Sequence, residues 1–217
     1  QEIQIWNKKV WWDNPTFIIA ELSANHGWSI ENAKRIIKEA ADAWADAIKL
    51  QTYTADTMTI DCDKSDFQIN SWTAWDGKNL YELYWEAYTP WEWHKELKDY
   101  ANSLWLELFS TPFDETAVNF LESINVPCHK IASFENNDIP LIKKVAKTGK
   151  PIIISTWMAT FEDVKLAVDT IRWEWNNQII LLKCTSSYPA PYEEINLKTI
   201  ESFQKDFDVI PWLSDHT

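Results

Sequence analysis

Residues 151–156 read Pro-Ile-Ile-Ile-Ser-Thr, and residues 178–186 read Gln-Ile-Ile-Leu-Leu-Lys-Cys-Thr-Ser. In both stretches a short, continuous apolar run ends in small hydroxyl side chains. A continuous run, rather than an alternating one, is typical of a strand buried on both faces, as in a parallel sheet covered by helices. The two stretches therefore predict an α/β fold whose strands end in polar residues.

The same pattern repeats along the rest of the chain. Further strand-like runs lie between amphipathic helical stretches, so that strand and helix alternate in order. This order predicts a (β/α)8 TIM barrel that is truncated after about seven strand-helix units, and a doubly wound sheet is the alternative. The expected strands are 17–22, 47–51, 106–110, 128–133, 151–155, 179–184 and 209–213; the expected helices are 30–43, 79–87, 91–103, 115–123, 139–147, 161–171 and 197–203.

The regions outside these units carry their own expectations. Residues 1–12 alternate weakly and predict a hairpin that caps the bottom of the barrel, within a single domain over 1–217. The stretch 52–77 is a long loop, and loops of that length are usually functional. The chain starts at Gln1 and stops at Thr217 inside a polar motif, which indicates a fragment.

Charge and cysteine content narrow the class of function. The 217 residues carry a formal net charge of −13, which argues against nucleic acid or an anionic membrane surface as a partner. A local cluster of lysines can still attract a small anionic substrate. We expect a cytoplasmic protein with reduced thiols, because the three cysteines are far apart and follow no metal-binding spacing: Cys62, Cys128 and Cys184.

The chain has 15 Trp and 3 Gly, where average usage predicts roughly 15 glycines. Trp44 lies between a helix and a strand, where a glycine usually ends the helix. Trp157 and Trp212 also lie at corners, next to polar motifs. We hypothesise that many of these positions are glycine in the living protein, for instance through a UGA codon that its source reads as glycine. The alternative is a chain rich in genuine core and stacking tryptophans, as we expect for Trp75, Trp91 and Trp93.

Polar side chains follow each expected strand, and in a barrel these carboxyl ends converge on one face. Lys49, Lys130 and Lys183 lie within or at the end of apolar runs. Together with Ser and Thr hydroxyls they predict a cradle for phosphate and carboxylate groups. The alternatives are solvated surface lysines, or one lysine that forms a Schiff base with a carbonyl substrate.

Carboxylates and one histidine complete the candidate chemistry. Glu21 and Glu135 lie at strand ends, as general bases or as hydrogen-bond partners of the substrate, and the alternative is a structural salt bridge with a lysine. His216, next to Asp215, is a candidate metal ligand, although a lone histidine is more often structural. We expect His94 and His129 to be structural or surface residues.

Six ordered segments together resemble the sialic acid synthase family. Members condense phosphoenolpyruvate with an N-acetylated amino sugar to a nonulosonic acid, with Mn²⁺ or Mg²⁺ as cofactor. Within that family the fourth and fifth segments look more like pseudaminic acid synthases than N-acetylneuraminate synthases. The segments are 17–26, 45–53, 109–113, 130–135, 183–189 and 213–217.

The resemblance implies roles for individual residues. Glu21 would contact the amino sugar, Glu135 would be the acid/base near the reacting carbons, and Lys130 would act in catalysis. His216 would be one metal ligand, and Tyr188 would line the site. The phosphoenolpyruvate contacts would be Lys49, Gln51, Thr111, Lys130, Ser133, Ser155, Ser186 and Ser214.

The resemblance also implies parts that this chain does not contain. The second metal ligand would lie beyond Thr217, and so would an antifreeze-like domain that completes a partner's site in a homodimer. The resemblance also implies glycine at five positions where this chain has tryptophan, namely residues 28, 44, 105, 157 and 212. The chain as written should therefore be inactive. Alternatives to a pseudaminic acid synthase are an N-acetylneuraminate or legionaminic acid synthase, a sugar-acid phosphate synthase, or an inactive relative.

Overall fold

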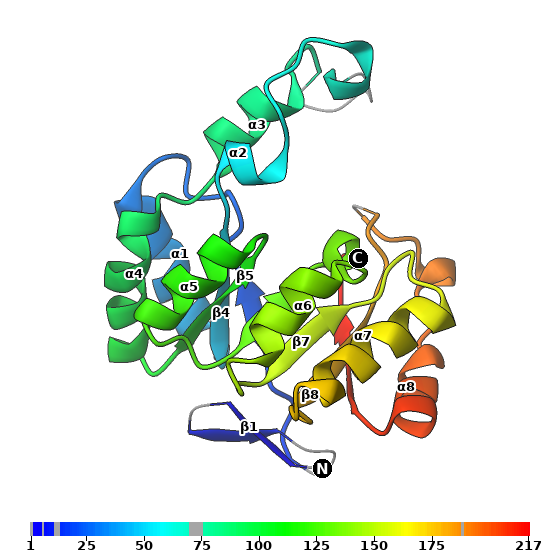
Figure 1. Ribbon diagram of the computed structural model, residues 1–217. Helices are drawn as coiled ribbons and strands as arrows, with labels where there is room; N and C mark the ends of the chain where they lie inside the picture. Colours follow the sequence, from blue (N-terminus) through cyan, green and yellow to red (C-terminus); the bar gives the residue numbers. More distant parts are fainter. Residues whose placement is uncertain (1, 6, 11–13, 70–75, 188) are drawn as a thin grey trace. The chain divides into compact units, whose positions relative to one another are not determined.

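The computed structural model describes residues 2–5, 7–10, 14–69, 76–187 and 189–217. The chain forms two compact units (Figure 1). One comprises residues 18–120, and the other comprises residues 1–17 together with 121–217. No helix among the described residues is both long and apolar enough to cross a lipid bilayer.

The unit of residues 18–120 is a parallel sheet of three strands with helices packed against it. Strand β3 (Ile19–Glu21) pairs with β4 (Ala47–Thr52), and β4 pairs with β5 (Glu107–Pro112), all in parallel. Two long helices, α1 (Ile30–Asp42) and α4 (Trp91–Ser103), bury their apolar sides against these strands. The segment after β4 contains α2 (Ala55–Met58), a 3₁₀ turn over Ser65–Phe67, and α3 (Leu80–Ala87).

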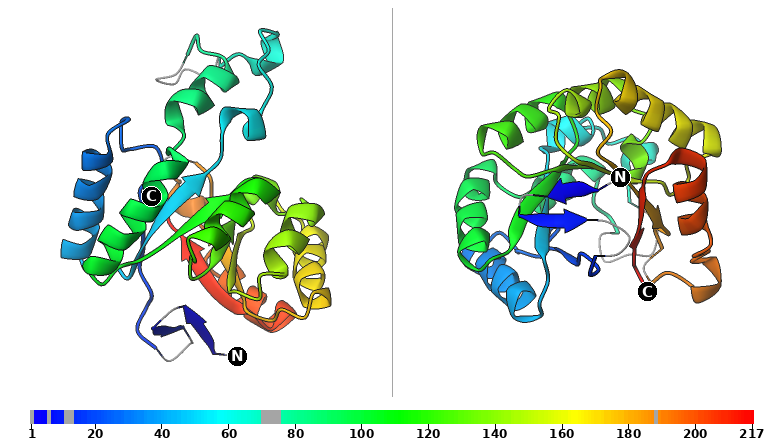
Figure 2. Two further views of the ribbon diagram at one scale, coloured as in Figure 1. Left: turned by 60° about the vertical axis from the view of Figure 1, so that its left-hand side comes forward. Right: turned by 90° about the horizontal axis from the view of Figure 1, so that it is seen from below.

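The second unit repeats the same strand-helix alternation. Its sheet is parallel, in the order β6, β7, β8, β9, and helices α6, α7 and α8 lie outside it (Figure 2). Helix α5 (Glu115–Ser123) crosses the boundary between the two units. The elements are β6 (His129–Ile131), α6 (Ile139–Ala146), β7 (Ile152–Ser155), α7 (Phe161–Trp173), β8 (Ile179–Cys184), α8 (Thr199–Phe207) and β9 (Ile210–Ser214).

The N-terminal hairpin is present in the second unit. Strands β1 (Ile3–Ile5) and β2 (Lys8–Val10) pair antiparallel, with Ile3 opposite Val10. It lies beyond the end at which β8 and β9 begin (Figures 1 and 2). The residues Ile3, Ile5 and Val10 are buried, so the weak alternation in the sequence marks a covered apolar face.

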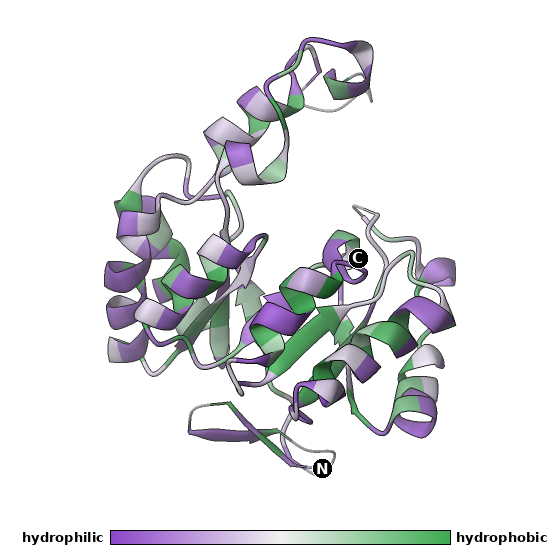
Figure 3. Cartoon of the chain, in the orientation of Figure 1, coloured by the Kyte–Doolittle hydropathy of each residue, from purple (hydrophilic) through white to green (hydrophobic). Residues whose placement is uncertain are grey.

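Continuous apolar runs do form strands buried on both faces. Ile152, Ile153 and Ile154 of β7 are each at most 1% exposed, and β7 is coloured hydrophobic along its length (Figure 3). The helices instead place hydrophobic and hydrophilic residues on different sides (Figure 3). This contrast follows from burial of a central parallel strand under helices, while a helix buries only one side.

Several boundaries differ from the expectation. The eighth helix runs over Thr199–Phe207 rather than 197–203, because Phe207 continues the buried side that Phe203 begins. The loop predicted over 52–77 contains helix α2 and the turn Ser65–Phe67, and its residues 70–75 lie outside the described part. Strand β6 ends at Ile131, and Ser133–Glu135 forms a 3₁₀ turn instead of continuing the strand.

Three helix ends carry a tryptophan in the left-handed region. Trp44, Trp105 and Trp175 have φ of 63°, 64° and 63°, and each follows a helix of the repeat. The residue after each donates its N–H to a carbonyl five residues back, as Ala45 does to Ala40, which is the hydrogen bond of a Schellman cap. Asn125 and Gly149 hold the same corner after α5 and α6, with φ of 53° and 71°. Of the positions where glycine was expected, Trp44 and Trp105 therefore do require a left-handed residue.

Other tryptophans do not fit that account. Trp28 is left-handed, with φ of 57°, but its indole Nε1 also donates to the carbonyl of Glu86 at 2.6 Å. Trp157 has no positive φ, which falls instead on its neighbour Met158, at 65°. Trp212 lies inside β9 and stacks on Phe17, with ring centroids 5.7 Å apart. Backbone strain therefore gives no argument for glycine at residues 157 and 212.

Candidate functional site

The first part of the predicted site lies at the carboxyl ends of β3, β4 and β5. The register places Glu21 beside Lys49, and Gln51 beside Thr111, so the four side chains share one face of the sheet. Lys49 is only 4% exposed, and its Nζ lies 3.1 Å from Oε2 of Glu21. The salt bridge that the sequence left open as an alternative for Glu21 is thus present.

Thr111 is the residue in this part that most needs a partner. Its Oγ1 is buried and forms no hydrogen bond in the described part of the chain. A buried hydroxyl without a partner costs about 1–3 kcal/mol. Because Thr111 lies on the same face as the buried Lys49 cation, an anionic oxygen placed there would satisfy both groups.

A buried hydrogen-bond chain lies behind these residues, on the opposite, helix-facing side of the strands. His94 Nδ1 lies 3.1 Å from the carbonyl of Pro90, which can only accept, so Nδ1 carries the proton. Nε2 therefore accepts from Thr52 Oγ1 at 2.8 Å, and Thr52 in turn accepts from Ser110 Oγ at 2.6 Å. Burial lowers the pKa of His94 to about 4, which agrees with a neutral ring.

These hydrogen bonds hold in place the two strand ends that carry predicted site residues. Thr52 follows Gln51 in β4, and Ser110 precedes Thr111 in β5. From the sequence His94 was expected to be a structural or surface residue, and Thr52 and Ser110 were not predicted as site residues. The signal available was a hydroxyl on each of two adjacent strand ends, one residue away from a candidate substrate contact.

The remaining predicted residues belong to the other unit and lie at the carboxyl ends of β6 to β9. Lys130, in β6, is 9% exposed, and Glu135 follows it in the 3₁₀ turn. Burial raises the pKa of Glu135, and the nearby Lys130 cation partly offsets that rise. Oε2 of Glu135 is buried without a hydrogen-bond partner among the described residues. A carboxyl group with a raised pKa holds its proton more readily than an exposed one, which suits a general acid.

Two predicted contacts, Ser155 and Ser214, share a face with Lys130, and Ser133 lies next to that face. Cross-strand register aligns Lys130 with Ile153, two residues before Ser155, and aligns Cys184 with Ser214. Ser133 Oγ lies 3.6 Å from Cys184 Sγ, which brings the end of β6 to that of β8. Ser155 is 4% exposed, and Ser186 follows β8 in a half-buried loop. The predicted contact Tyr188 lies outside the described residues.

Lys183 does not join the other lysines in a common cradle. Because side chains alternate along a strand, Lys183 lies on the opposite face of β8 from Cys184 and Ser214. Its Nζ donates to the carbonyl of Cys184 at 2.9 Å and to Thr185 Oγ1 at 3.0 Å. The interpretation of Lys183 as part of the same phosphate cradle as Lys130 is wrong for this reason.

His216 is oriented as a metal ligand would be. Its Nδ1 lies 2.8 Å from the carbonyl of Thr185, so Nδ1 carries the proton and Nε2 is the acceptor nitrogen of the ring. Ser214 Oγ lies 3.5 Å from that Nε2. The described residues contain no group of three His, Cys, Asp or Glu side chains that could hold a metal ion. One imidazole does not make a complete site, so we assign no reaction step to a metal.

The arrangement defines a class of protein: a parallel α/β chain with cations, hydroxyls and a carboxyl group at its strand ends. The crystal structure of the N-acetylneuraminic acid synthetase from Leptospira borgpetersenii, in complex with citrate, covers the whole chain with a TM-score of 0.88 at 32% identity, over 70% of that structure's chain. A spore coat polysaccharide biosynthesis protein from Bacillus subtilis covers it with a TM-score of 0.84 at 37% identity, over 57% of its own chain. These likenesses confirm the predicted barrel class.

Residues 36–217 match the NeuB family, and the chain belongs to that family. It is 46% identical to the pseudaminic acid synthase of Campylobacter jejuni over 205 residues, 94% of this chain and 60% of that protein. The pseudaminic acid synthase of Helicobacter pylori is also 46% identical, over 94% of this chain and 59% of its own length. The chain thus spans about 60% of the curated relatives it matches.

Proposed function

We propose that the protein condenses phosphoenolpyruvate with an N-acetylated amino sugar to give a nonulosonic acid and phosphate. The sugar we favour is a 2,4-diacetamido-2,4,6-trideoxy hexose, as expected for a pseudaminic acid synthase. The observation that carries the proposal is a pair of buried lysines, Lys49 and Lys130, whose strand-end faces also hold the unpartnered polar atoms of Thr111 and Glu135. Family membership and 46% identity to two pseudaminic acid synthases support it.

The proposed roles follow from charge and burial. A buried ammonium group attracts an anion, and phosphoenolpyruvate supplies both a phosphate and a carboxylate. We propose Lys49, Gln51 and Thr111 as its contacts in the unit of residues 18–120, and Lys130 as a contact in the other unit. The remaining phosphoenolpyruvate contacts that we propose are Ser133, Ser155, Ser186 and Ser214.

The reaction forms one carbon–carbon bond and breaks one carbon–oxygen bond. C3 of phosphoenolpyruvate adds to the aldehyde carbon of the open-chain sugar, and the aldehyde oxygen takes a proton. Water then adds at C2, and inorganic phosphate leaves with cleavage of its bond to C2. Glu135, whose pKa is raised by burial, is our candidate for the proton transfer, and Glu21 for holding the amino sugar.

The cofactor, assembly and location complete the proposal. We propose Mn²⁺ or Mg²⁺ as cofactor with His216 as one ligand, because the proton on Nδ1 makes Nε2 the coordinating type of nitrogen. When bound, such an ion would supply Lewis-acid polarisation of the sugar aldehyde. We further propose a cytoplasmic enzyme that forms a homodimer at full length, a single barrel domain over residues 1–217, and no activity for the chain as written.

The decisive experiment is phosphate release from phosphoenolpyruvate by the full-length protein, with three sugars compared. We expect turnover with the 2,4-diacetamido-2,4,6-trideoxy hexose to exceed that with N-acetylmannosamine. Lys130→Met should lower kcat/KM by about 10²-fold or more, since a buried charge contact contributes about 3 kcal/mol. Glu135→Gln should lower kcat more than KM, and should remove the limb of the pH profile that Glu135 sets.

The matched control is Lys143→Met, which removes an exposed lysine from α6 and should leave turnover unchanged. Full activity of Lys130→Met would refute our site. A preference for N-acetylmannosamine or for a legionaminic acid precursor would keep the reaction class and change the subtype. A diacetyllegionaminic acid synthase from Legionella pneumophila is 37% identical to this chain over 93% of it, and is the next candidate.

A further inference from the structure

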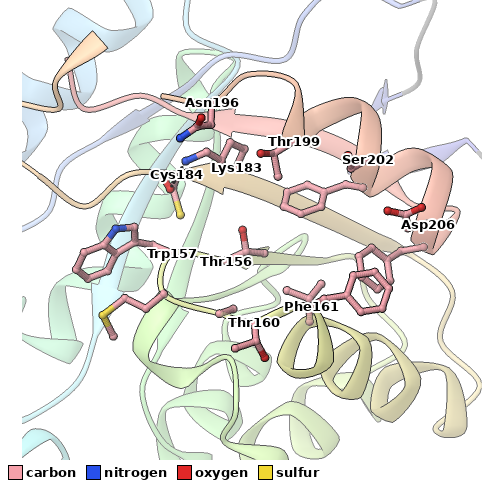
Figure 4. Close-up of a pocket in the computed structure, with 15 residues that line it drawn as sticks. Thr156, Trp157, Thr160, Phe161, Lys183, Cys184, Asn196, Thr199, Ser202 and Asp206 are labelled. Carbon is pink, nitrogen blue, oxygen red and sulfur yellow. Dashed lines mark hydrogen bonds between the residues drawn. The ribbon is translucent and has the colours of Figure 1, made fainter. Parts of the chain in front are cut away.

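A second pocket lies on the helix-facing side of the second unit, between α7 and α8 (Figure 4). Its volume is about 440 Å³, which is within the range of small-molecule sites. Lys183 and Asn196 lie at one end, and Asp206 lies at the other (Figure 4). It does not include Lys130, Ser133, Ser155 or Ser214, which lie on the other face of the sheet or at its strand ends.

The first end of the pocket favours an anion. Lys183 is half-buried and uses two donors on Cys184 and Thr185, so a third N–H remains for a ligand. Within the described part of the chain no carboxylate forms an ion pair with Lys183. The N-termini of α7 and α8 border the pocket through Thr160 and Thr199, but each helix also carries a carboxylate in its first turn, so the positive charge at this end is that of Lys183.

The middle of the pocket is apolar. Phe203 and Phe207 are 6% and 7% exposed, and the Phe161 and Phe207 rings lie 5.0 Å apart. At the rim, Phe161 and Met158 are 53% and 63% exposed, although both are large apolar side chains. Met158 also has φ of 65°, a strained value for a residue with a long side chain. Exposed apolar groups beside a cavity are typical of a surface that covers a ligand.

We infer that this pocket binds a small organic monoanion, with its carboxylate or sulfonate at Lys183 and its apolar body between α7 and α8. Asp206 disfavours a second negative charge at the far end, so a single charge at one end fits best. The inference does not depend on the proposed function, because none of the residues assigned to phosphoenolpyruvate line this pocket.

The pocket also has a short connection to the proposed metal ligand. The Lys183 ammonium donates a hydrogen bond to the Thr185 hydroxyl, and the Thr185 carbonyl accepts one from His216 Nδ1. A ligand that draws Lys183 away from Thr185 would disturb the residue that orients His216. Occupation of the pocket should therefore change the environment of His216, which is measurable by NMR of its imidazole nitrogens.

The test is a calorimetric titration of the full-length protein with 2-naphthoate. We expect saturable binding, and the uncharged analogue 2-naphthol should bind more weakly. Lys183→Met should lower the affinity for 2-naphthoate at least about tenfold, since a charge-assisted hydrogen bond contributes about 1.4 kcal/mol or more. Lys183→Arg should restore most of the affinity. Phe161→Ser, at the exposed rim, tests the apolar part independently of Lys183.

Lys205→Met is the matched control, because Lys205 is an exposed lysine of α8 that does not line the pocket. Thermal unfolding of each variant establishes that it is folded. The inference is overturned if 2-naphthoate does not bind, or if its affinity is unchanged in both Lys183→Met and Phe161→Ser. It is also overturned if the affinity falls as much in Lys205→Met as in Lys183→Met. Competitive displacement by phosphoenolpyruvate would also overturn it, by assigning the binding to the substrate site.

Discussion

Trp44, Trp105 and Trp175 combine an unfavourable backbone with a side chain that contacts little. They are 89%, 88% and 93% exposed, so their indoles gain almost no burial in return for the left-handed φ. A residue with a Cβ in this region costs about 1–2 kcal/mol. Asn125 and Gly149 occupy the same corner after neighbouring helices, and these are residue types that tolerate it.

At this scale we predict that Trp44→Gly, Trp105→Gly and Trp175→Gly each stabilise the protein. The expected gain is about 0.5–1 kcal/mol, because relief of the left-handed strain exceeds the entropy that glycine adds to the unfolded chain. Denaturant unfolding at constant m-value measures it.

The control is Trp173→Gly, two residues before Trp175. Trp173 is the last residue of α7, has no left-handed φ and is 65% exposed, so glycine there should destabilise, by up to about 1 kcal/mol. Destabilisation by all four changes would mean that the indoles have a structural role. UGA codons at Trp44 and Trp105, and UGG at Trp91 and Trp93, would support the glycine hypothesis directly.

At the scale of elements, one buried hydrogen-bond chain joins α4 to β4 and β5. All its hydrogen bonds are donated in the same direction. Ser110 donates to Thr52, Thr52 donates to His94, and His94 donates to the carbonyl of Pro90. The direction is fixed at the Pro90 end, where the partner has no proton to give. Each member therefore has a different cost of removal.

We predict that Thr52→Val is the most damaging change in this chain. It leaves the Ser110 hydroxyl proton and the His94 Nε2 lone pair unpaired, which should cost about 1–3 kcal/mol. Ser110→Ala removes only a terminal donor, and should cost less than about 1 kcal/mol beyond its lost volume.

Thr52→Ser keeps the hydroxyl and is the matched control for Thr52→Val. Unfolding free energies of the three variants give the ranking. A larger effect for Ser110→Ala than for Thr52→Val would contradict this arrangement, in which Thr52 has a partner on both sides and Ser110 lies at the end.

At the scale of the whole molecule, buried neutral histidines couple folding to pH. Burial lowers the pKa of His94 to about 4, and the neighbouring His26 acts in the same direction, while backbone carbonyls and Glu92 oppose it. Burial also lowers the pKa of His26. The unfolded chain binds these protons near pH 6.5 and the folded chain does not. Their contribution is complete above about pH 6.5 and is lost as the pH falls towards 4.

We predict that the free energy of unfolding falls by about 3 kcal/mol between pH 6.5 and 4 through His94, at about 1.36 kcal/mol per pH unit. His94→Gln, which cannot titrate, should be less stable at pH 7 and should show a shallower pH dependence. Denaturant titrations at several pH values test this, and equal slopes for both proteins would contradict it.

The sequence by itself determined the order and type of the elements. Runs such as 152–154 and 179–182 are apolar without interruption, and so short a run between polar residues is typical of a strand buried on both faces. Six local motifs also sufficed for the family, because each is contiguous. The helix end at Trp44 could be located as a left-handed corner, since a cap depends on neighbours within one turn.

Only the tertiary structure decided which side chains share a face and what they contact. Lys183 and Lys130 look alike in sequence, yet strand register and alternation place them on opposite faces. The partners of His94 are distant along the chain, and its proton position depends on all of them. Contacts of this kind depend on how separate elements pack, and a local pattern carries no information about that distance.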